Sequence, residues 1–112
     1  MPEFTTLLER AIAISKNKTK GVFVLSIPDW GVMPFAQGRD RTKIATEIEA
    51  YNATIKAICE RYEVAFFDIT PISREALSNA TYVANDQLHP SAAMYGAWVD
   101  KVIPFFNTAQ ND

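Results

Sequence analysis

Apolar residues recur every third or fourth position in three stretches of the chain, and this spacing is typical of amphipathic helices. The first stripe predicts a helix over about residues 3–16 and consists of Phe4, Leu7, Leu8, Ala11 and Ile12. The second predicts a long helix over about residues 40–62, with Ile44, Ile48, Tyr51, Ile55, Ile58 and Tyr62 in one seam. The third predicts a helix over about residues 91–104 whose apolar face comprises Ala92, Tyr95, Gly96, Val99, Val102 and Ile103.

Polar residues and prolines mark where these helices begin and end. Asp40 and Ser91 are suited to cap the second and third helices, because their side chains can accept hydrogen bonds from the first free amides. The basic run at residues 16–20 is expected to end the first helix. Pro104 lacks an N–H and is expected to kink or end the last helix, which leaves residues 107–112 as a polar tail. The long seam would also suit a coiled coil, but packing on a sheet is the preferred interpretation.

Two short apolar runs, about residues 22–27 and 64–69, lack the alternation of a half-exposed strand. Continuous apolar runs are typical of strands that are buried on both faces in parallel sheets. Strand, long helix and strand together form a βαβ unit, and the fold class is therefore α/β. Asp68 falls within the second run and should need a polar partner, since an unpaired buried charge is costly.

Two strands alone leave an open edge on each side and cannot shield each other. We therefore expect residues 1–112, a single α/β domain, to associate with a second copy or with a complementary chain. A homo-oligomer and a missing N-terminal half both satisfy this expectation.

Composition narrows the class of protein further. The chain has 48% hydrophobic and 21% charged residues, as in globular proteins, and its net charge of −2 offers no basis for binding nucleic acid. No apolar run reaches the roughly 20 residues of a membrane span, and residues 1–3 do not begin a signal peptide. As it stands the chain reads as cytoplasmic, with the compartment of a longer parent left open. The single cysteine, Cys59, lies on an apolar helix face and reads as a buried hydrophobic residue.

Candidate chemistry centres on the run Asn85-Asp86-Gln87-Leu88-His89-Pro90-Ser91, which contains the only histidine. Asp86 lies three residues before His89 and could accept the proton of its Nδ1, as the carboxylate does in serine hydrolases. The alternative is an ordinary loop histidine beside a turn or cap carboxylate. No second histidine or cysteine supports a metal site, and no glycine-rich loop supports a nucleotide cofactor, so we expect neither metal nor cofactor.

The loop from Pro28 to Gly38 leaves the carboxyl end of the first predicted strand, where ligands bind in open parallel sheets. Asp29, Trp30 and Phe35 are therefore candidates to line a site. Alternatively, the two aromatic rings plug the end of the core. The second strand is followed by a short helical turn and then a loop that should deliver Asp86 and His89 to the same edge.

Asp-x-x-His-Pro before a closing helix resembles the last conserved block of the SGNH (GDSL-type) hydrolases. Further similar stretches occur in the same order: residues 24–31 (VLSIPDWG), residues 66–70 (FFDIT) and the pair Tyr95 and Trp98. The resemblance runs from about Glu3 to Phe106 and covers only the second half of such a domain. The Gly-Asp-Ser nucleophile block and the Gly and Gly-x-Asn-Asp oxyanion blocks of the family are absent from these residues.

The resemblance implies a partial flavodoxin-like, three-layer fold and acyl-ester hydrolysis in the parent, lipase-like enzyme. His89 would be the general base and acid, and Asp86 would orient it, with a small-molecule ester as substrate. The nucleophilic serine would come from outside this chain, because Ser15, Ser26, Ser73, Ser78 and Ser91 lie in no nucleophile turn. The alternative is a non-catalytic α/β module, retained for binding or self-association.

Overall fold

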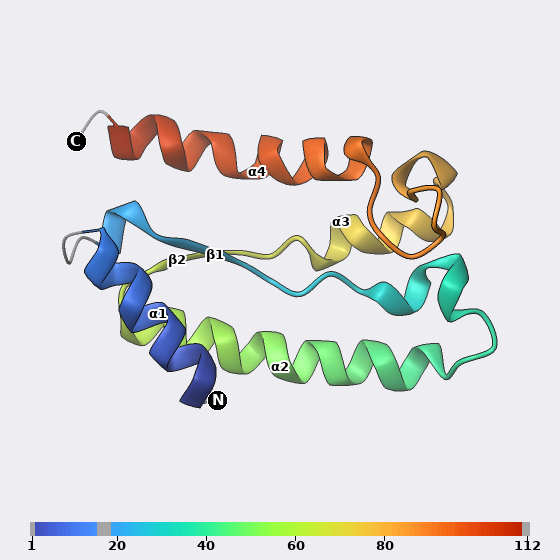
Figure 1. Ribbon diagram of the computed structural model, residues 1–112, viewed down its shortest axis with the longest axis horizontal. Coiled ribbons are helices and arrows are strands. Elements are labelled where there is room, and N and C mark those ends of the chain that lie inside the picture. Colours follow the sequence, from blue (N-terminus) through green and yellow to red (C-terminus); the bar gives the residue numbers. More distant parts are fainter. Residues whose placement is uncertain (1, 16–18, 111–112) are drawn as a thin grey trace.

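The computed structural model describes residues 2–15 and 19–110 as three layers, with a two-stranded parallel sheet between helices (Figure 1). Helix α4 (Ala92–Gln110) covers one face of the sheet. Helices α1 (Pro2–Ile14) and α2 (Arg41–Arg61) lie on the other face. Helices on both faces are the usual setting of parallel strands, so the predicted α/β, flavodoxin-like class is confirmed.

The two strands are shorter than the apolar runs that predicted them. Strand β1 (Phe23–Leu25) pairs in parallel with β2 (Ala65–Phe67), and Val24 lies opposite Phe66. Pairing stops after Leu25 because the backbone N–H of Ile27 donates to the side chain of Asn52 (2.7 Å) instead of to a strand. Along its three principal axes the described structure extends over 45 × 30 × 18 Å.

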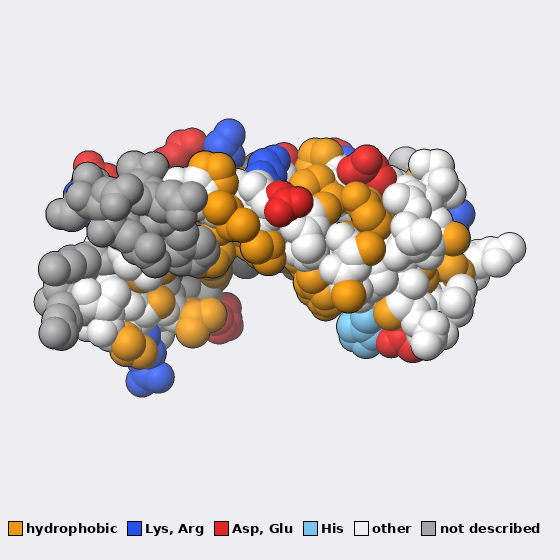
Figure 2. Space-filling view, turned by 90° about the horizontal axis from the view of Figure 1, so that it is seen from above, with side chains coloured by type: hydrophobic (Ala, Val, Ile, Leu, Met, Phe, Trp, Pro, Cys, Tyr) orange, Lys and Arg blue, Asp and Glu red, His pale blue; other side chains and the backbone are white. Residues whose placement is uncertain are grey.

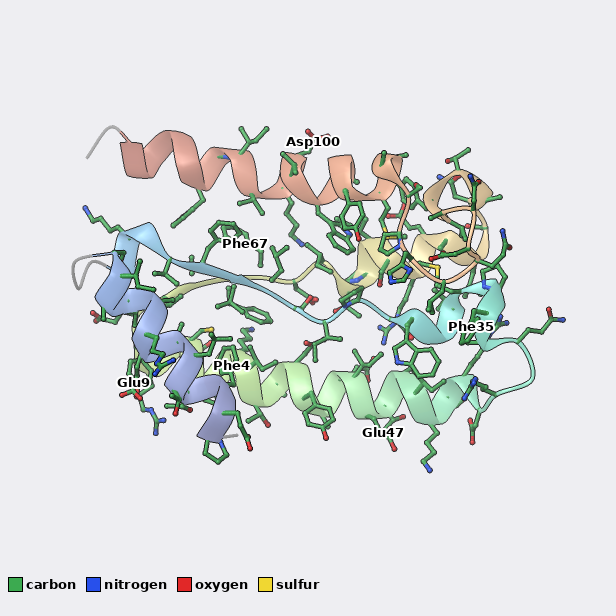
Figure 3. All side chains as sticks on the ribbon, in the orientation of Figure 1. Phe4, Glu9, Phe35, Glu47, Phe67 and Asp100 are labelled. Carbon is green, nitrogen blue, oxygen red and sulfur yellow. The ribbon has the colours of Figure 1, made fainter. Side chains whose placement is uncertain are left out.

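Two clusters of buried side chains form the core, one on each face of the sheet. Between α1, α2 and the sheet lie Leu8, Val22, Ile55, Cys59 and Val64. Between α4, the loops and the sheet lie Val32, Met33, Ile69, Ala76, Met94 and Trp98. Figure 3 shows Phe4 between α1 and α2, and Phe67 between the sheet and α4. Cys59 has no exposed surface, as predicted, and burial raises the pKa of its thiol.

The predicted caps of the two long helices are confirmed. The side chain of Asp40 accepts a hydrogen bond from the backbone N–H of Lys43 (3.0 Å) at the start of α2. The Ser91 hydroxyl accepts from the N–H of Met94 (3.3 Å) at the start of α4. The first helix ends at Ile14, ahead of the basic run predicted to end it. Residues 16–18 of that run lie outside the described residues, and its last two residues belong to a 3-10 turn, η1 (Thr19–Gly21). The end of the predicted tail, residues 111–112, also lies outside the described residues.

The predicted end of the last helix at Pro104 is wrong, because α4 continues through Pro104 to Gln110. The ring of Phe105 packs against Phe67 (centroids 5.6 Å apart) and Phe23 (6.1 Å). These contacts stabilise the helix just after the proline and offset the hydrogen bond that the proline cannot donate.

The predicted apolar faces are only partly buried. Leu7 on α1 and Tyr51 on α2 are exposed, although the spacing assigned both to the core. On α4 the core face is formed by Met94, Trp98 and Val102, while Tyr95, Val99 and Ile103 face outward. The reason is that α4 packs on the narrow sheet along one line, and its second apolar stripe has no element beneath it.

Short helices connect β2 to the final loop. Helix α3 (Thr70–Arg74) begins two residues beyond the end of β2, where a short helical turn was expected, and continues as a 3-10 turn, η4 (Glu75–Leu77). A further turn, η5 (Ala80–Tyr82), precedes the loop with Asp86 and His89. Within the described residues, no helix combines the length and the apolar character needed to cross a membrane.

Candidate active site

The loop that carries His89 is closed by its own backbone. The N–H of Ala84 donates to the carbonyl of His89, and the N–H of Ser91 donates to that of Tyr82, both at 2.9 Å. Val83 and Pro90 face each other as an antiparallel bridge between these bonds. Residues 84–89 are therefore held as a turn at the start of α4, and the capped helix fixes its position.

Asp86 organises the inside of this turn. Its Oδ1 accepts the backbone N–H groups of Leu88 and His89, each at 2.9 Å. Its Oδ2 makes a short contact with Nδ1 of the His89 ring. The backbone hydrogen bond from His89 is the largest cause that lowers the pKa of Asp86, from 3.8 to about 2, and the side-chain bond to His89 comes next. The carboxylate thus stays ionised and holds the imidazole in one orientation.

The outer nitrogen of the imidazole is left open to solvent. The His89 side chain is 66% exposed, and among the described residues none forms a hydrogen bond to Nε2. Figure 2 shows this histidine, in pale blue, at the surface. When Nδ1 carries the proton that Asp86 accepts, Nε2 has a free lone pair, which is the arrangement needed to take a proton from a hydroxyl.

The loop after β1 reaches the histidine turn. The N–H of Phe35 donates to the carbonyl of Gln87 (2.9 Å), so the predicted convergence of the two loops is present. Figure 3 shows Phe35 at the end of the molecule that these loops form. Phe35 is 53% exposed and Trp30 38%, so neither ring simply plugs the core.

Arg39 joins these two rings. Its guanidinium carbon lies 5.9 Å from the centroid of the Trp30 ring and 5.7 Å from that of Phe35. Sequence reasoning did not identify Arg39, because only the stacking in the folded loop distinguishes it from an ordinary surface cation.

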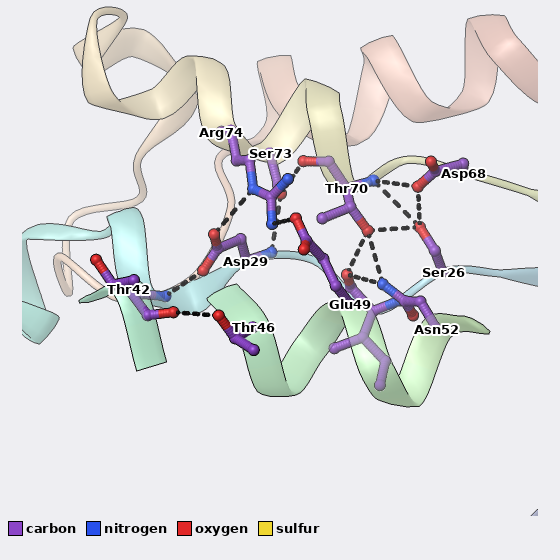
Figure 4. Close-up of polar contacts among 12 residues, drawn as sticks. Ser26, Asp29, Thr42, Thr46, Glu49, Asn52, Asp68, Thr70, Ser73 and Arg74 are labelled. Carbon is purple, nitrogen blue, oxygen red and sulfur yellow. Dashed lines mark hydrogen bonds and ion pairs between the residues drawn. The ribbon is translucent and has the colours of Figure 1, made fainter. Parts of the chain in front are cut away.

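Asp29 has a different environment from Trp30 and Phe35. It is 2% exposed, and its carboxylate accepts hydrogen bonds from the N–H of Gly31 (2.9 Å) and from Nε of Arg74 (3.0 Å). Arg74 also pairs with Glu49 on α2 (3.0 Å). Asp29 therefore caps the turn η2 (Trp30–Val32) and links it to α3 (Figure 4). Both oxygens of its carboxylate accept hydrogen bonds inside the protein.

A second polar cluster joins the carboxyl ends of the two strands (Figure 4). The hydroxyl of Ser26 accepts the N–H groups of Ile69 (2.8 Å) and Thr70 (3.1 Å) and lies 3.0 Å from Oδ1 of Asp68. The expectation that Asp68 is buried is wrong, because β2 ends before it and it is exposed. It still finds polar partners in Ser26 and in the N–H of Thr70 (3.2 Å).

The serine hydroxyls are bonded away from His89. Ser73 donates to the carbonyl of Thr70, Ser91 to that of Thr81 and Ser78 to that of Glu75. Ser26 lies in the buried cluster, and Ser15 bonds the carbonyl of Ile12. No described serine is hydrogen-bonded to the imidazole. Among the described residues, no three His, Cys, Asp or Glu side chains gather where they could hold a metal ion.

Comparison with known proteins adds one finding. A model of the GDSL-like lipase/acylhydrolase family matches residues 1–97, which is most of the chain and includes the whole Asp86–His89 turn. No curated protein and no solved structure matches the chain.

Proposed function

Since this chain belongs to the GDSL-like lipase/acylhydrolase family, we propose that it provides the acid–base half of an acyl-ester hydrolase site. In this proposal His89 is the general base and acid, and Asp86 is the residue that orients it. The observation that carries the proposal is the turn itself. One carboxylate fixes the ring through Nδ1, and Nε2 points away from it into solvent.

The chemistry would proceed through an acyl-enzyme. Nε2 would remove the proton of a serine hydroxyl while the serine oxygen forms a bond to the ester carbonyl carbon. The imidazolium would then protonate the alkoxide that leaves when the ester bond breaks. A water molecule would release the acyl group by the same two proton transfers. The ionised Asp86 would stabilise the imidazolium throughout, and its lowered pKa suits that role.

The serine would come from outside residues 1–112. Each serine hydroxyl among the described residues donates to the backbone or lies in the Ser26 cluster, so none is poised for attack. The same observation favours the second candidate function for the chain by itself: a non-catalytic α/β module that binds another polypeptide.

Trp30 and Phe35 would line the site as an apolar wall for the acyl or alcohol part of the ester. Their exposed rings and the link from Phe35 to Gln87 support this role. Asp29 would position this wall and would not line it, because its carboxylate holds η2 against Arg74.

The test is hydrolysis of an unactivated ester such as ethyl butyrate, since a free imidazole attacks activated esters by itself. The purified chain would be assayed alone and with a separately expressed half domain of a family member that carries the Gly-Asp-Ser block. We expect no turnover and no fluorophosphonate labelling of the chain alone, and turnover with the half domain that His89→Ala abolishes. Labelling of a serine in this chain, or turnover that survives His89→Ala, would contradict the proposal.

A further inference from the structure

Arg39 carries a positive charge that no carboxylate of the described chain neutralises. Its side chain is exposed, and among the described residues no Asp or Glu forms an ion pair with it. The carboxylate of the adjacent Asp40 is used to cap α2. Arg74, by contrast, pairs with Asp29 and Glu49, each at 3.0 Å. The guanidinium of Arg39 is therefore open to an anion from solution.

The loop holds Arg39 in a defined position. The backbone turns at Gly38, where φ is 89°, a conformation that glycine adopts freely. The N–H of Arg39 then donates to the carbonyl of Ala36 (3.0 Å). The guanidinium carbon comes to 5.9 Å from the ring centroid of Trp30 and 5.7 Å from that of Phe35. Because the side chain is already ordered on two rings, a ligand that binds it pays less conformational entropy.

The chemistry around Arg39 favours a carboxylate next to a carbon chain. Its N–H groups form no side-chain hydrogen bond to another described residue, and their planar fork matches the two oxygens of a carboxylate. The adjoining rings of Trp30 and Phe35, 38% and 53% exposed, suit the chain. A phosphate monoester carries nearly two negative charges near neutral pH, and the carboxylate of Asp40 beside a single guanidinium disfavours the second charge.

Phe35 connects this cation to the histidine. Its ring lies beside the Arg39 guanidinium, and its backbone N–H donates to the carbonyl of Gln87 (2.9 Å), two residues before His89. Figure 3 shows Phe35 at the end of the molecule that these loops form. The guanidinium and the open Nε2 of His89 thus belong to the same end of the molecule. A ligand that extends over the Phe35 ring could contact both.

We propose that Arg39 is a specificity-determining residue that binds a carboxylate on the acyl chain of the ester. The preferred substrates are then monoesters of dicarboxylic acids. The carboxylate lies on Arg39, the carbon chain lies along the rings of Trp30 and Phe35, and the ester lies at His89. This inference rests on the proposed function for the ester hydrolysis itself, whereas the binding of the carboxylate requires only the stacked cation.

The probes are monoethyl adipate, which carries one carboxylate, and diethyl adipate, which has the same carbon chain without the charge. Each would be titrated into the full chain at neutral pH and constant ionic strength, and proton–nitrogen NMR would follow the Arg39 Nε–H and the His89 ring. We expect the monoester to shift both signals and to bind about fivefold more tightly than the diester, as for an exposed ion pair. Equal binding of the two esters would overturn the proposal. So would a monoester that leaves the signals of Arg39 or of His89 in place.

A second stacked arginine supplies the matched control. Arg39→Gln removes the charge of an exposed side chain, so the fold should persist, and we expect the two esters to bind it equally. Arg61 lies at the other end of α2, with its guanidinium carbon 5.6 Å from the ring centroid of Tyr62. Arg61→Gln should keep the fivefold preference. A preference that survives Arg39→Gln, or that Arg61→Gln also abolishes, would overturn the proposal.

Because this readout is binding, the two proposals fail separately. A preference for the monoester that Arg39→Gln abolishes, together with turnover that survives His89→Ala in the assay with the half domain, would contradict only the proposed function. Turnover that depends on His89, without preferential binding of the monoester, would contradict only the role of Arg39.

Discussion

The backbone N–H of Phe35 donates a hydrogen bond of 2.9 Å to the carbonyl of Gln87, and this bond joins the loop after β1 to the turn that holds His89. Gln87 makes it from a left-handed backbone conformation, with φ at 65°. A β-branched residue avoids that conformation, whereas glycine adopts it freely.

We therefore expect Gln87→Val to lower the free energy of unfolding by about 1–2 kcal/mol. Gln87→Gly should stay within about 1 kcal/mol of the wild type. Urea denaturation measures both. Glu63, with φ at 59°, provides the matched site far from the histidine: Glu63→Val should also destabilise the protein but leave the His89 NMR signals unchanged. Equal stability of Gln87→Val and the wild type would show that the turn is not held in this conformation.

Asp86 should make stability depend on pH in the acid range. Its pKa is lowered from 3.8 to about 2 in the folded protein, so the unfolded chain binds more protons between these values. The stabilising contribution is fully present above about pH 4 and is lost as the pH falls toward 2. Urea denaturation at steps from pH 5 to about pH 2 should show a steeper decline for the wild type than for Asp86→Asn. Parallel curves would mean that Asp86 is not held by the turn.

Ser26 should matter for stability more than its size suggests. Its hydroxyl is the acceptor for the N–H groups of Ile69 and Thr70, and the residue is 3% exposed. Ser26→Ala removes the acceptor of the Ile69 amide and leaves the Thr70 amide with the carboxylate of Asp68 (3.2 Å), which should cost about 1–3 kcal/mol of unfolding free energy. Ser78→Ala removes an exposed hydroxyl that bonds only Glu75 and should change stability by less than about 0.5 kcal/mol. Chemical denaturation that ranks the two variants equally would exclude Ser26 as the link between the strand ends.

Cys59 should react with thiol reagents only when the protein opens. The residue has no exposed surface, and burial raises the pKa of the thiol, so little reactive thiolate is present near neutral pH. We expect labelling by 5,5′-dithiobis(2-nitrobenzoate) to be at least a hundredfold slower in native buffer than in denaturant. Labelling should speed up in Ser26→Ala by about tenfold for each ~1.4 kcal/mol of unfolding free energy that the substitution removes. Fast labelling in native buffer would show that α2 does not pack on α1 and the sheet as described.

The sequence predicted the elements well where a local rule determines them. The caps at Asp40 and Ser91, the burial of Cys59 and the parallel βαβ unit all follow from spacing and residue type. The predicted strands were too long because apolar residues continue past the last ladder bond. Only the folded position of Asn52 explains why pairing stops before Ile27.

The remaining errors share one physical cause, which is that a side chain's burial depends on what lies opposite it. Periodicity assigned Tyr95 and Val99 to the core, but within the part of the chain that the structure describes the sheet is two strands wide, and both side chains are exposed. Pro104 failed to end α4 because Phe105 packs on the sheet beyond it. In the candidate site, the pairing of Asp86 with His89 was predictable from three-residue spacing. The role of Arg74 depends on contacts with residues distant in sequence, and that of Arg39 depends on the final shape of its loop.

The measurement that tests the central claim most directly is the tautomer of His89, read from its imidazole nitrogens by proton–nitrogen NMR. The chain has one histidine, so the signals need no further assignment. In alkaline buffer, where the imidazole is neutral, the ring should carry its proton on Nδ1, with Nε2 unprotonated, and Asp86→Ala should shift the proton toward Nε2. A wild-type ring that is protonated on Nε2 could not accept a proton there, and this result would contradict the role of His89 as the general base of an acyl hydrolase.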